Sequence, residues 1–456
     1  MEECKIKSTC DELNQFLTTL SQQSIPSPEV LLASSDTSTI HSGSTEAYRC
    51  KCSFQVITDK DDNLECVVRE NGEICHLPQG IFPPANLRIR EAMNCLMNVL
   101  NKRSTAVDSN TRASHTYIRL RENLTSVTFD SSWNEAECLL TLHYGPPGIS
   151  KSCFEQWKQE AKILCDECDF VRVTGRSKGI KLFVSRSNIA AAADDHSLRE
   201  EGIIQDILWL TLQKSSDDEK SIPRVESVSL KQPEQSTGRL NVQILYQKPA
   251  TAFQHPNAGV MLTSLHWILN TLSKVAERHT ENKKLRLLEM YNGAGAHTIP
   301  LAKSMLFTEI VAVELDERLV SACKKNCRLN NCLKGDEVSD QNETLVEVFK
   351  GDAAEWAAKT LRRISKKESN GTTNDYNEFD ILLVDPPRQG LNETVCEMAI
   401  KGTFSHLIYI SCGRRALVRD LTLLCKSFDI EDLTIIDLFP GTDAVETLIH
   451  LKRKVD

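Results

Sequence analysis

From about residue 250 to the C-terminus, the chain alternates short apolar segments with longer amphipathic ones. The segments LRLLEM, EIVAVEL, DILLVD and HLIYIS have the length of buried strands, whereas HWILNTLSKVAERH, ERLVSACKKNCRLNN and RALVRDLTLLC have helical periodicity. Strands that alternate with helices in this way form a mainly parallel sheet covered by helices. The pattern therefore predicts a doubly wound α/β domain over residues 249–456.

The residues before this domain follow a different pattern. The strand-like segments YRCKCSFQVI, ECVVRE and EICHLP precede the helical segment REAMNCLMNVLNKR, and the strand-like SVTFD and CLLTLHYG follow it. This order predicts an α+β domain with antiparallel strands over residues 46–248, with an exposed polar insertion at 213–238. Residues 1–45 are rich in Ser and Thr, and we expect a flexible segment with one short helix.

Composition excludes several classes of protein. No run of eighteen apolar residues is present and the acidic start lacks the apolar core of a secretory signal, so we expect a soluble, intracellular protein without a membrane span, cytoplasmic by default. The 17 cysteines are scattered, and Cys165-x-x-Cys168 lacks the second pair that a zinc site needs. We therefore expect reduced thiols and no metal.

The net charge of −9 does not indicate a polyanion partner, because nucleic-acid binding depends on Lys and Arg. Any surface for RNA must therefore be local. The local groups of basic residues are Arg49 with Lys51; Arg112, Arg119 and Arg121; Arg172, Arg176, Lys178 and Lys181; and Arg414, Arg415 and Arg419. One such group by itself more often marks a solvated surface.

A glycine turn follows the first strand of the α/β domain. In LLEMYNGAGAH, Gly293 and Gly295 let the backbone pass close to a ligand, and the next strand, EIVAVEL, ends in Glu314 about twenty residues later. An acidic residue at that distance can accept hydrogen bonds from both ribose hydroxyls of an adenosine ligand. Asp352 in VEVFKGDAAEW follows the third strand, where we expect the adenine edge.

Three further polar residues stand at strand ends. Asp385 in LLVDPPRQGL precedes two prolines that fix the chain in an extended turn. Cys412 in HLIYISCGRRALVRDL lies between a strand and a helix, and we expect the helix N-terminus, Arg414 and Arg415 to favour its thiolate. Glu446 lies in a late strand, after a Phe-Pro turn. Taken alone, the cysteine is equally consistent with an inert buried thiol, and the glutamate with an ordinary surface carboxylate.

Together, the motifs VDPPRQGL, IYISCG and FPxTxxxE, the last ending at Glu446, resemble those of the RNA (uracil-5-)-methyltransferase family, most closely its tRNA T-loop branch. The resemblance extends from about Tyr48 to Lys454. It implies an N-terminal RNA-binding domain and a class I, Rossmann-like domain that binds S-adenosylmethionine. The implied cofactor contacts are Tyr291, Gly293, Gly295, Glu314, Asp385, His255 and Asp352, and the implied RNA contacts are Arg49, Gln254, Asn257 and Arg388.

The resemblance also implies a covalent mechanism. The thiolate of Cys412 adds to carbon 6 of uracil, which makes carbon 5 a nucleophile strong enough to accept a methyl group. Glu446 then removes the proton from carbon 5, and elimination releases the cysteine. The target base must first leave its stack, at a cost of a few kcal/mol.

The chain departs from the family pattern at three places. The family's Phe-x-Gln-x-Asn segment is Phe253-Gln254-His255-Pro256-Asn257 here, so either His255 or Gln254 takes the contact of the usual Gln. Ala296 replaces an Asn in the glycine turn, and Gly413-Arg414 replace an Asn-Pro pair after the nucleophile. The chain has no cysteine quartet of the ribosomal-RNA branch and no preceding small RNA-binding barrel, which favours the tRNA branch.

Two other functions stay open. An RNA cytosine-5 methyltransferase has a second cysteine directly after the proline of the fourth-strand motif, where this chain has Pro387 and then Arg388. A catalytically degenerate RNA-binding or chaperone relative is the other alternative, although the chain keeps Cys412 and Glu446. We expect RNA, specifically tRNA, as the partner, and a monomeric protein.

Overall fold

The structure is a computed structural model of the chain and describes residues 9, 11–12, 15, 40–41, 46–70, 72–77, 80–102, 117–186, 202–213, 223–250, 255–279, 284–336, 344–370, 379–440, 442 and 444–455. Contacts divide the chain into two compact units. The C-terminal unit comprises residues 1–43, 207–247 and 259–456, and the N-terminal unit comprises residues 44–206 and 248–258.

An eight-stranded sheet is the centre of the C-terminal unit. Its strands are β1 (Ile40–His41), β12 (Leu285–Met290), β13 (Phe307–Glu314), β14 (Leu345–Lys350), β15 (Ile381–Val384), β16 (His406–Ser411), β17 (Phe428–Asp437) and β18 (Val445–Arg453). Their order in the sheet is β1-β17-β18-β16-β15-β12-β13-β14. Strands β12 to β16 pair in parallel, whereas β18 is antiparallel to both its neighbours. The order reverses between β12 and β15, and open α/β sheets bind ligands at such a switch point.

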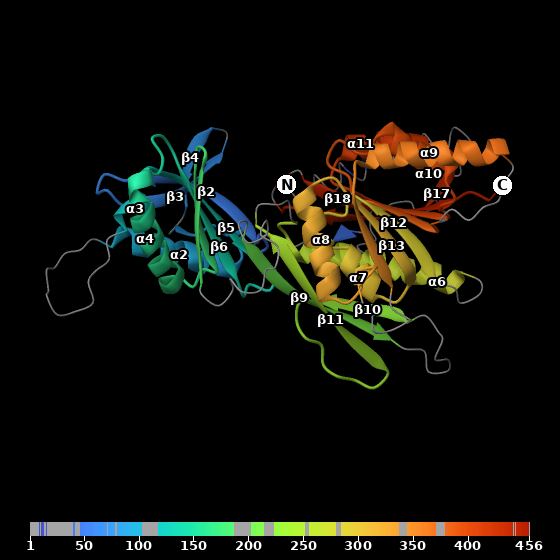
Figure 1. The fold of residues 1–456 in the computed structure, drawn as a ribbon, viewed down its shortest axis with the longest axis horizontal. Coiled ribbons are helices and arrows are strands. Elements are labelled where there is room, and N and C mark those ends of the chain that lie inside the picture. Colours follow the sequence, from blue (N-terminus) through green and yellow to red (C-terminus); the bar gives the residue numbers. More distant parts are fainter. Residues whose placement is uncertain are drawn as a thin grey trace. The chain divides into compact units, whose positions relative to one another are not determined.

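Helices cover both faces of this sheet, which explains why its central strands read as continuous apolar runs. One face is packed against α9 (Ala353–Asn370), α10 (Glu393–Lys401) and α11 (Arg414–Leu424), whose apolar side chains share a core with the strands. The other face carries α6 (Ala258–Arg278), α7 (Thr298–Lys303) and α8 (Glu317–Leu329) (Figure 1). The predicted doubly wound domain is therefore confirmed. No helix in the described part of the chain is long and apolar enough to cross a membrane.

The N-terminal unit is built on a seven-stranded sheet in the order β4-β3-β2-β5-β6-β7-β8. The strands are β2 (Lys51–Thr58), β3 (Leu64–Glu70), β4 (Glu73–His76), β5 (Leu124–Ser131), β6 (Cys138–Tyr144), β7 (Arg172–Ser177) and β8 (Ile180–Ser185). All neighbours are antiparallel except β6 and β7. Helices α2 (Leu87–Asn101), α3 (Ile118–Arg121) and α4 (Phe154–Glu167) pack on one face of the sheet, as expected for an α+β unit.

The contacts divide the chain differently from the predicted boundary at residue 248. Strands β9 (Ile203–Gln213), β10 (Arg224–Ser229) and β11 (Arg239–Pro249) form a separate three-stranded sheet, and residues 207–247 belong to the C-terminal unit. Two buried amides, one in α8 and one directly after it, hold β11 there: Asn326 Oδ1 accepts from Gln247 N at 2.8 Å, and Asn330 Oδ1 accepts from Leu245 N at 3.0 Å. The predicted polar insertion thus contains a strand, and its residues 214–222 lie outside the described part.

The N-terminal segment is also more structured than predicted at the few positions that are described. Strand β1 extends the large sheet by pairing in parallel with β17, and buried Thr9 accepts a hydrogen bond from Arg414 at 3.1 Å. The expectation of reduced thiols fails at Cys168, which forms a disulfide with Cys95. Among the described residues, no group of three or more His, Cys, Asp or Glu is arranged to hold a metal.

Candidate active site

The predicted site residues of the C-terminal unit gather at one edge of the large sheet. Tyr291, Asp385 and Cys412 directly follow parallel strands β12, β15 and β16, and Glu314 ends β13. Strand β18 runs the opposite way and begins at this edge, with Glu446 as its second residue. The pairing of Ser411 with Thr447 makes Cys412 and Glu446 neighbours across the end of the sheet.

The glycine turn after β12 is held by the next strand. Tyr291 has a φ of +65°, a conformation that costs energy for a residue with a side chain, and its N–H donates to Val313 O at 2.9 Å. Gly293 (φ +58°) donates its N–H to Glu314 Oε2 at 2.9 Å, and its missing Cβ leaves open space. Gly295 (φ +89°) packs on α8, because a Cβ would lie 2.9 Å from Cys323 Sγ. The two glycines therefore serve different purposes.

Two acidic residues beside this turn also bind backbone. Glu314 Oε1 accepts from Leu315 N at 2.8 Å and from Asp316 N at 2.9 Å, which fixes the carboxylate at the strand end. Asp352 caps helix α9, because its Oδ1 accepts from Ala354 N at 2.8 Å and from Glu355 N at 3.1 Å. The structure thus gives Asp352 a role in the fold, and its contact with adenine stays a prediction.

The strand that leads into the turn contains a carboxylate, Glu289, for which no role was predicted from the sequence. Glu289 in β12 is completely buried, and among the residues that the structure describes neither of its oxygens has a hydrogen-bond partner. Burial raises its pKa to about 8; the nearby Thr298 hydroxyl lowers it, and Asp385 and Glu314 raise it further. Buried polar groups normally have partners. The available signal was its position, since Glu289 is a charged residue in an otherwise apolar strand before a glycine turn.

These features fit S-adenosylmethionine. An unpartnered buried carboxylate suits the cationic amino-acid end of that molecule, and the fixed Glu314 carboxylate suits its ribose hydroxyls. Gly293 comes between these two residues in the sequence, and the open space beside it lets a ligand approach the backbone. The residues that would hold the cofactor are therefore Glu289, Tyr291, Gly293, Glu314 and Asp385.

The environment of the Cys412 thiol differs from the prediction. Burial raises its pKa, and the Asp385 and Glu446 carboxylates raise it further, whereas the Arg388 guanidinium and the cysteine's own backbone lower it. The prediction that Arg414 and Arg415 favour the thiolate is therefore wrong. Arg414 instead binds Thr9, and the leading stabilising cation comes from the DPPR loop after β15.

The loop of Arg388 also touches the nucleophile turn. A Cβ at residue 413 would lie under 3.0 Å from the Arg388 carbonyl oxygen, so only glycine fits without movement. The Gly413 N–H donates to Ser411 Oγ at 3.2 Å, which closes the turn around Cys412. The departure from the family's Asn at this position therefore has a steric reason.

The remaining predicted contacts lie in the N-terminal unit. Arg49 and Asn257 form an isolated antiparallel bridge, and His255 Nδ1 lies 2.9 Å from Asn257 O. The His255 carbonyl accepts from Trp133 Nε1 at 3.3 Å, which ties this segment to the unit's core. Gln254 lies outside the described residues. The roles of these residues toward cofactor or RNA stay predictions.

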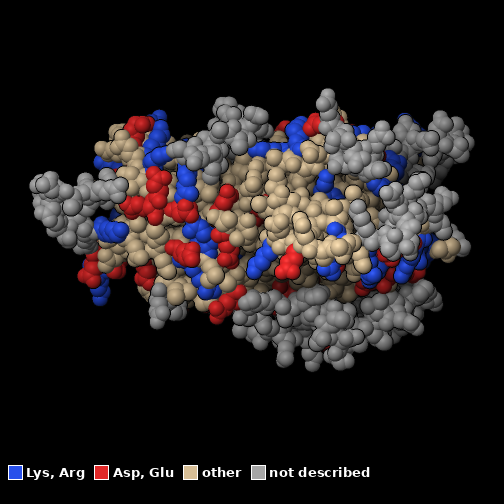
Figure 2. Space-filling model, turned by 90° about the horizontal axis from the view of Figure 1, so that it is seen from below, with Lys and Arg blue, Asp and Glu red and all other residues tan. Residues whose placement is uncertain are grey.

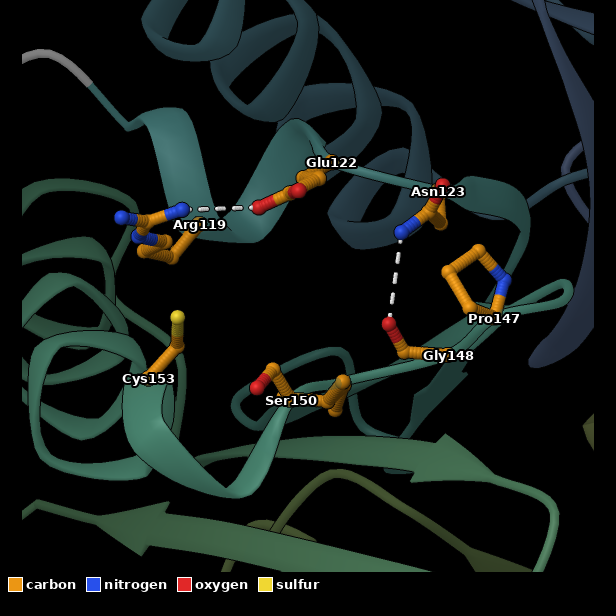
Figure 3. A pocket seen from close by; sticks show the side chains of 8 residues that line it. Arg119, Glu122, Asn123, Pro147, Gly148, Ser150 and Cys153 are labelled. Atoms are coloured by element: carbon orange, nitrogen blue, oxygen red, sulfur yellow. Dashed lines mark hydrogen bonds and ion pairs between the residues drawn. The ribbon is translucent and has the colours of Figure 1, made fainter.

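A cavity of about 280 Å³ also lies in the N-terminal unit (Figure 3). Arg119 points to its rim, but its guanidinium is already bound to Glu122 at 2.9 Å and to Gln156 at 3.0 Å. Asn123 donates to Gly148 O at 3.3 Å across the cavity. None of the predicted catalytic residues is among those that line it.

Comparisons with known proteins identify the family of the chain. The model of the tRNA (Uracil-5-)-methyltransferase family matches residues 227–454. A tRNA/tmRNA (uracil-C(5))-methyltransferase of Pseudoalteromonas atlantica is 25% identical over 411 residues, 89% of this chain and 88% of the relative. One of the same name from Sulfurimonas denitrificans is 27% identical over 331 residues, 73% of this chain and 70% of the relative.

A solved structure has the same fold. The Pyrococcus abyssi tRNA (uracil-54, C5)-methyltransferase, solved in complex with S-adenosyl-L-homocysteine, superposes with a TM-score of 0.51 at 16% identity, over 90% of this chain and 78% of the other. The family match, the two relatives and the strand-end site lead to one conclusion. The chain belongs to the tRNA (uracil-5-)-methyltransferase family of S-adenosylmethionine-dependent RNA methyltransferases.

Proposed function

We propose that the chain methylates carbon 5 of a uridine in the T loop of tRNA through a covalent adduct of Cys412. The observation that carries this proposal is the position of Cys412 and Glu446 at neighbouring strand ends. The names of the curated relatives, tRNA/tmRNA (uracil-C(5))-methyltransferase, support tRNA as the substrate. The sequence resemblance to the T-loop branch supports the position within it.

The chain's residues would divide the chemistry between them. Cys412 Sγ forms a bond to carbon 6 of uracil, and the electrons of the 5,6 double bond move toward carbon 5 and the carbonyl at carbon 4. S-adenosylmethionine, when bound, supplies the electrophilic methyl group for carbon 5. Glu446 takes the proton from the methylated carbon 5, the double bond re-forms, and the bond between sulfur and carbon 6 breaks.

Burial makes Glu446 suitable for this last step. The residue is 6% exposed, so bulk water has little access to the carboxylate once RNA covers the edge of the sheet. The carboxylates of Asp385 and Glu446 both raise the pKa of Cys412, so these three predicted residues share one electrostatic environment. A base that removes a proton from carbon must be held in a fixed position relative to that carbon.

Acidic and basic side chains are interspersed on the face seen in Figure 2. Because RNA phosphates bind Lys and Arg, a surface that binds RNA must be a smaller region in which basic residues predominate. Strands β6, β7 and β8 of the N-terminal unit contain no Asp or Glu. Arg176 pairs with Lys181 and Thr174 with Phe183, on the opposite side of the sheet from core residues Val173 and Leu182. We call Arg172, Arg176, Lys181 and Phe183 the basic face.

The basic face combines the two features that single-stranded RNA requires. The Arg172 guanidinium lies 4.5 Å above the Phe183 ring, and Phe183 is 37% exposed. Aromatic rings stack on unpaired bases, and cations bind the phosphates beside them. This arrangement supports RNA binding by the N-terminal unit, because the loop of a tRNA arm presents unstacked bases.

The product of the reaction tests the proposed function. The protein is incubated with S-adenosylmethionine and an unmodified tRNA transcript, and the digested nucleosides are analysed by mass spectrometry. We expect 5-methyluridine, and its loss when the T-loop uridine is replaced by cytidine. Appearance of 5-methylcytidine would support the cytosine enzyme instead, and binding of tRNA without methylation would support the degenerate relative.

A further inference from the structure

A buried carboxylate joins three elements around the proposed nucleophile. Asp420 on helix α11 is 1% exposed. Its Oδ2 accepts from the N–H of Leu391 at 2.7 Å and from the Tyr409 hydroxyl at 2.6 Å. Its Oδ1 accepts from Arg419 Nε at 2.8 Å. A buried carboxylate is costly unless several donors satisfy it, and here each donor comes from a different segment or side chain.

Arg419, which binds Asp420, also holds the loop that carries Arg388. Arg419 Nη2 donates to Gln389 O at 2.9 Å and to Leu391 O at 3.0 Å, so the loop is bound on both sides of Gly390. Gly390 has a φ of +77°, and a Cβ there would lie 2.5 Å from Asp420 Oδ2. The loop backbone therefore rests directly on the carboxylate.

The two partners of Oδ2 lead to the two sides of the proposed site. Tyr409 precedes Cys412 by three residues in β16, and Leu391 follows Arg388 by three residues in the loop. The loop also meets the nucleophile turn, where the Arg388 carbonyl lies against Gly413. Asp420 Oδ2 thus connects strand β16, which leads to Cys412, with the loop that carries Arg388.

We propose that Asp420 is a positioning residue, which holds the loop of Arg388 against the strand of Cys412 and so fixes the cation beside the nucleophile. Asp420 acts on the thiol indirectly, through Tyr409, Leu391 and Arg419. This inference rests on the proposed role of Cys412 as nucleophile. It adds a group remote from substrate that determines how readily the thiolate forms.

Alkylation of Cys412 as a function of pH tests this inference without RNA. The protein is treated with iodoacetamide between pH 6 and 10, and the rate is followed on the Cys412 peptide by mass spectrometry. The variants are Tyr409→Phe, which removes one hydroxyl, and Asp420→Asn, which removes the charge and one acceptor. The control is Asp429→Asn, the same chemical change beside Lys452 at the other end of the sheet.

We expect both test variants to shift the pH midpoint of alkylation upward and to slow it at pH 7.5 by roughly three- to tenfold, since one pKa unit changes the thiolate fraction about tenfold. The control should match the wild type. A fall in melting temperature with an unchanged pH profile in Tyr409→Phe would overturn the inference, because a purely structural role predicts that result. If the two test variants shift the pH profile but the wild-type protein does not methylate tRNA, the result would count against the proposed function alone.

Discussion

The carbonyl oxygen of Arg388 lies where a side chain at Gly413 would begin: a Cβ there would come within 3.0 Å of it. Two loops that follow different strands, β15 and β16, are therefore in direct contact beside Cys412. The same loop brings the guanidinium that lowers the pKa of Cys412. The absence of a side chain at residue 413 thus determines how closely the cation and the thiol approach each other.

Gly413→Ala should separate these loops. We expect covalent adduct formation to slow by roughly tenfold or more, as a displacement of about 1 Å can cost a factor of 100 in a positioned reaction. Single-turnover kinetics on RNA that contains 5-fluorouridine measures the rate. Gly72→Ala is the control, since φ is +88° there but no atom of the described residues lies within 4 Å of the new Cβ. An unchanged rate in Gly413→Ala would show that the close approach has no function.

The raised pKa of Cys412 predicts a pH dependence for the ligand-free protein. Because the folded protein favours the protonated thiol, alkylation of Cys412 should accelerate about tenfold for each pH unit until the pH reaches that pKa. The rate should still be rising at pH 8. A rate that is flat between pH 6 and 8 would mean that the thiolate is already formed, which would contradict a raised pKa for Cys412.

Glu289 should make the cofactor-free protein less stable as pH rises. Its pKa is about 8 in the folded state against an ordinary value of 4.5, so the folded state binds the proton more tightly. This contribution is complete below pH 4.5 and is lost as pH rises through 8. Glu289→Gln should therefore lose less thermal stability than the wild type between pH 5 and 8, while binding S-adenosylmethionine more weakly by calorimetry. Equal losses in the two proteins would contradict the assigned pKa.

Charge reversal on the basic face should weaken RNA binding. In Arg176→Glu/Lys181→Glu, we expect the dissociation constant for tRNA to rise by roughly tenfold or more and its salt dependence to become less steep, since each lost phosphate contact lowers the slope by about one. Fluorescence anisotropy at several salt concentrations measures both. The control Lys158→Glu/Lys162→Glu makes the same change in net charge on helix α4. Equal weakening in both would mean that the effect is one of total charge.

Local patterns predicted the parts of this molecule that depend on local structure. Periodicity was enough to place Glu314, Asp385 and Cys412 at strand ends, because parallel strands in one sheet present their ends at one edge. The same patterns could not reveal that residues 207–247 pack with the C-terminal unit. That assignment depends on Asn326 and Asn330, which are remote in sequence from the strand they bind.

The electrostatics of the site were also beyond the sequence. Arg414 is nearest to Cys412 along the chain but is bound to Thr9, whereas Arg388 comes from the preceding strand's loop. The bond between Tyr409 and Asp420 likewise depends on how a helix packs on its strand. Motif spacing carries no information about such contacts, and the prediction from the nearest arginine failed for that reason.

Trapping the bond between Cys412 and the target base tests the proposed mechanism most directly. Fluorine at carbon 5 cannot leave as a proton, so the base at Glu446 has nothing to remove and the adduct persists. The wild-type protein, incubated with S-adenosylmethionine and a T-arm RNA containing 5-fluorouridine, should gain the mass of the methylated RNA under denaturing conditions. Cys412→Ala should form no adduct, and Glu446→Gln should accumulate one even with ordinary uridine. An adduct or a methylated product with Cys412→Ala would contradict the mechanism.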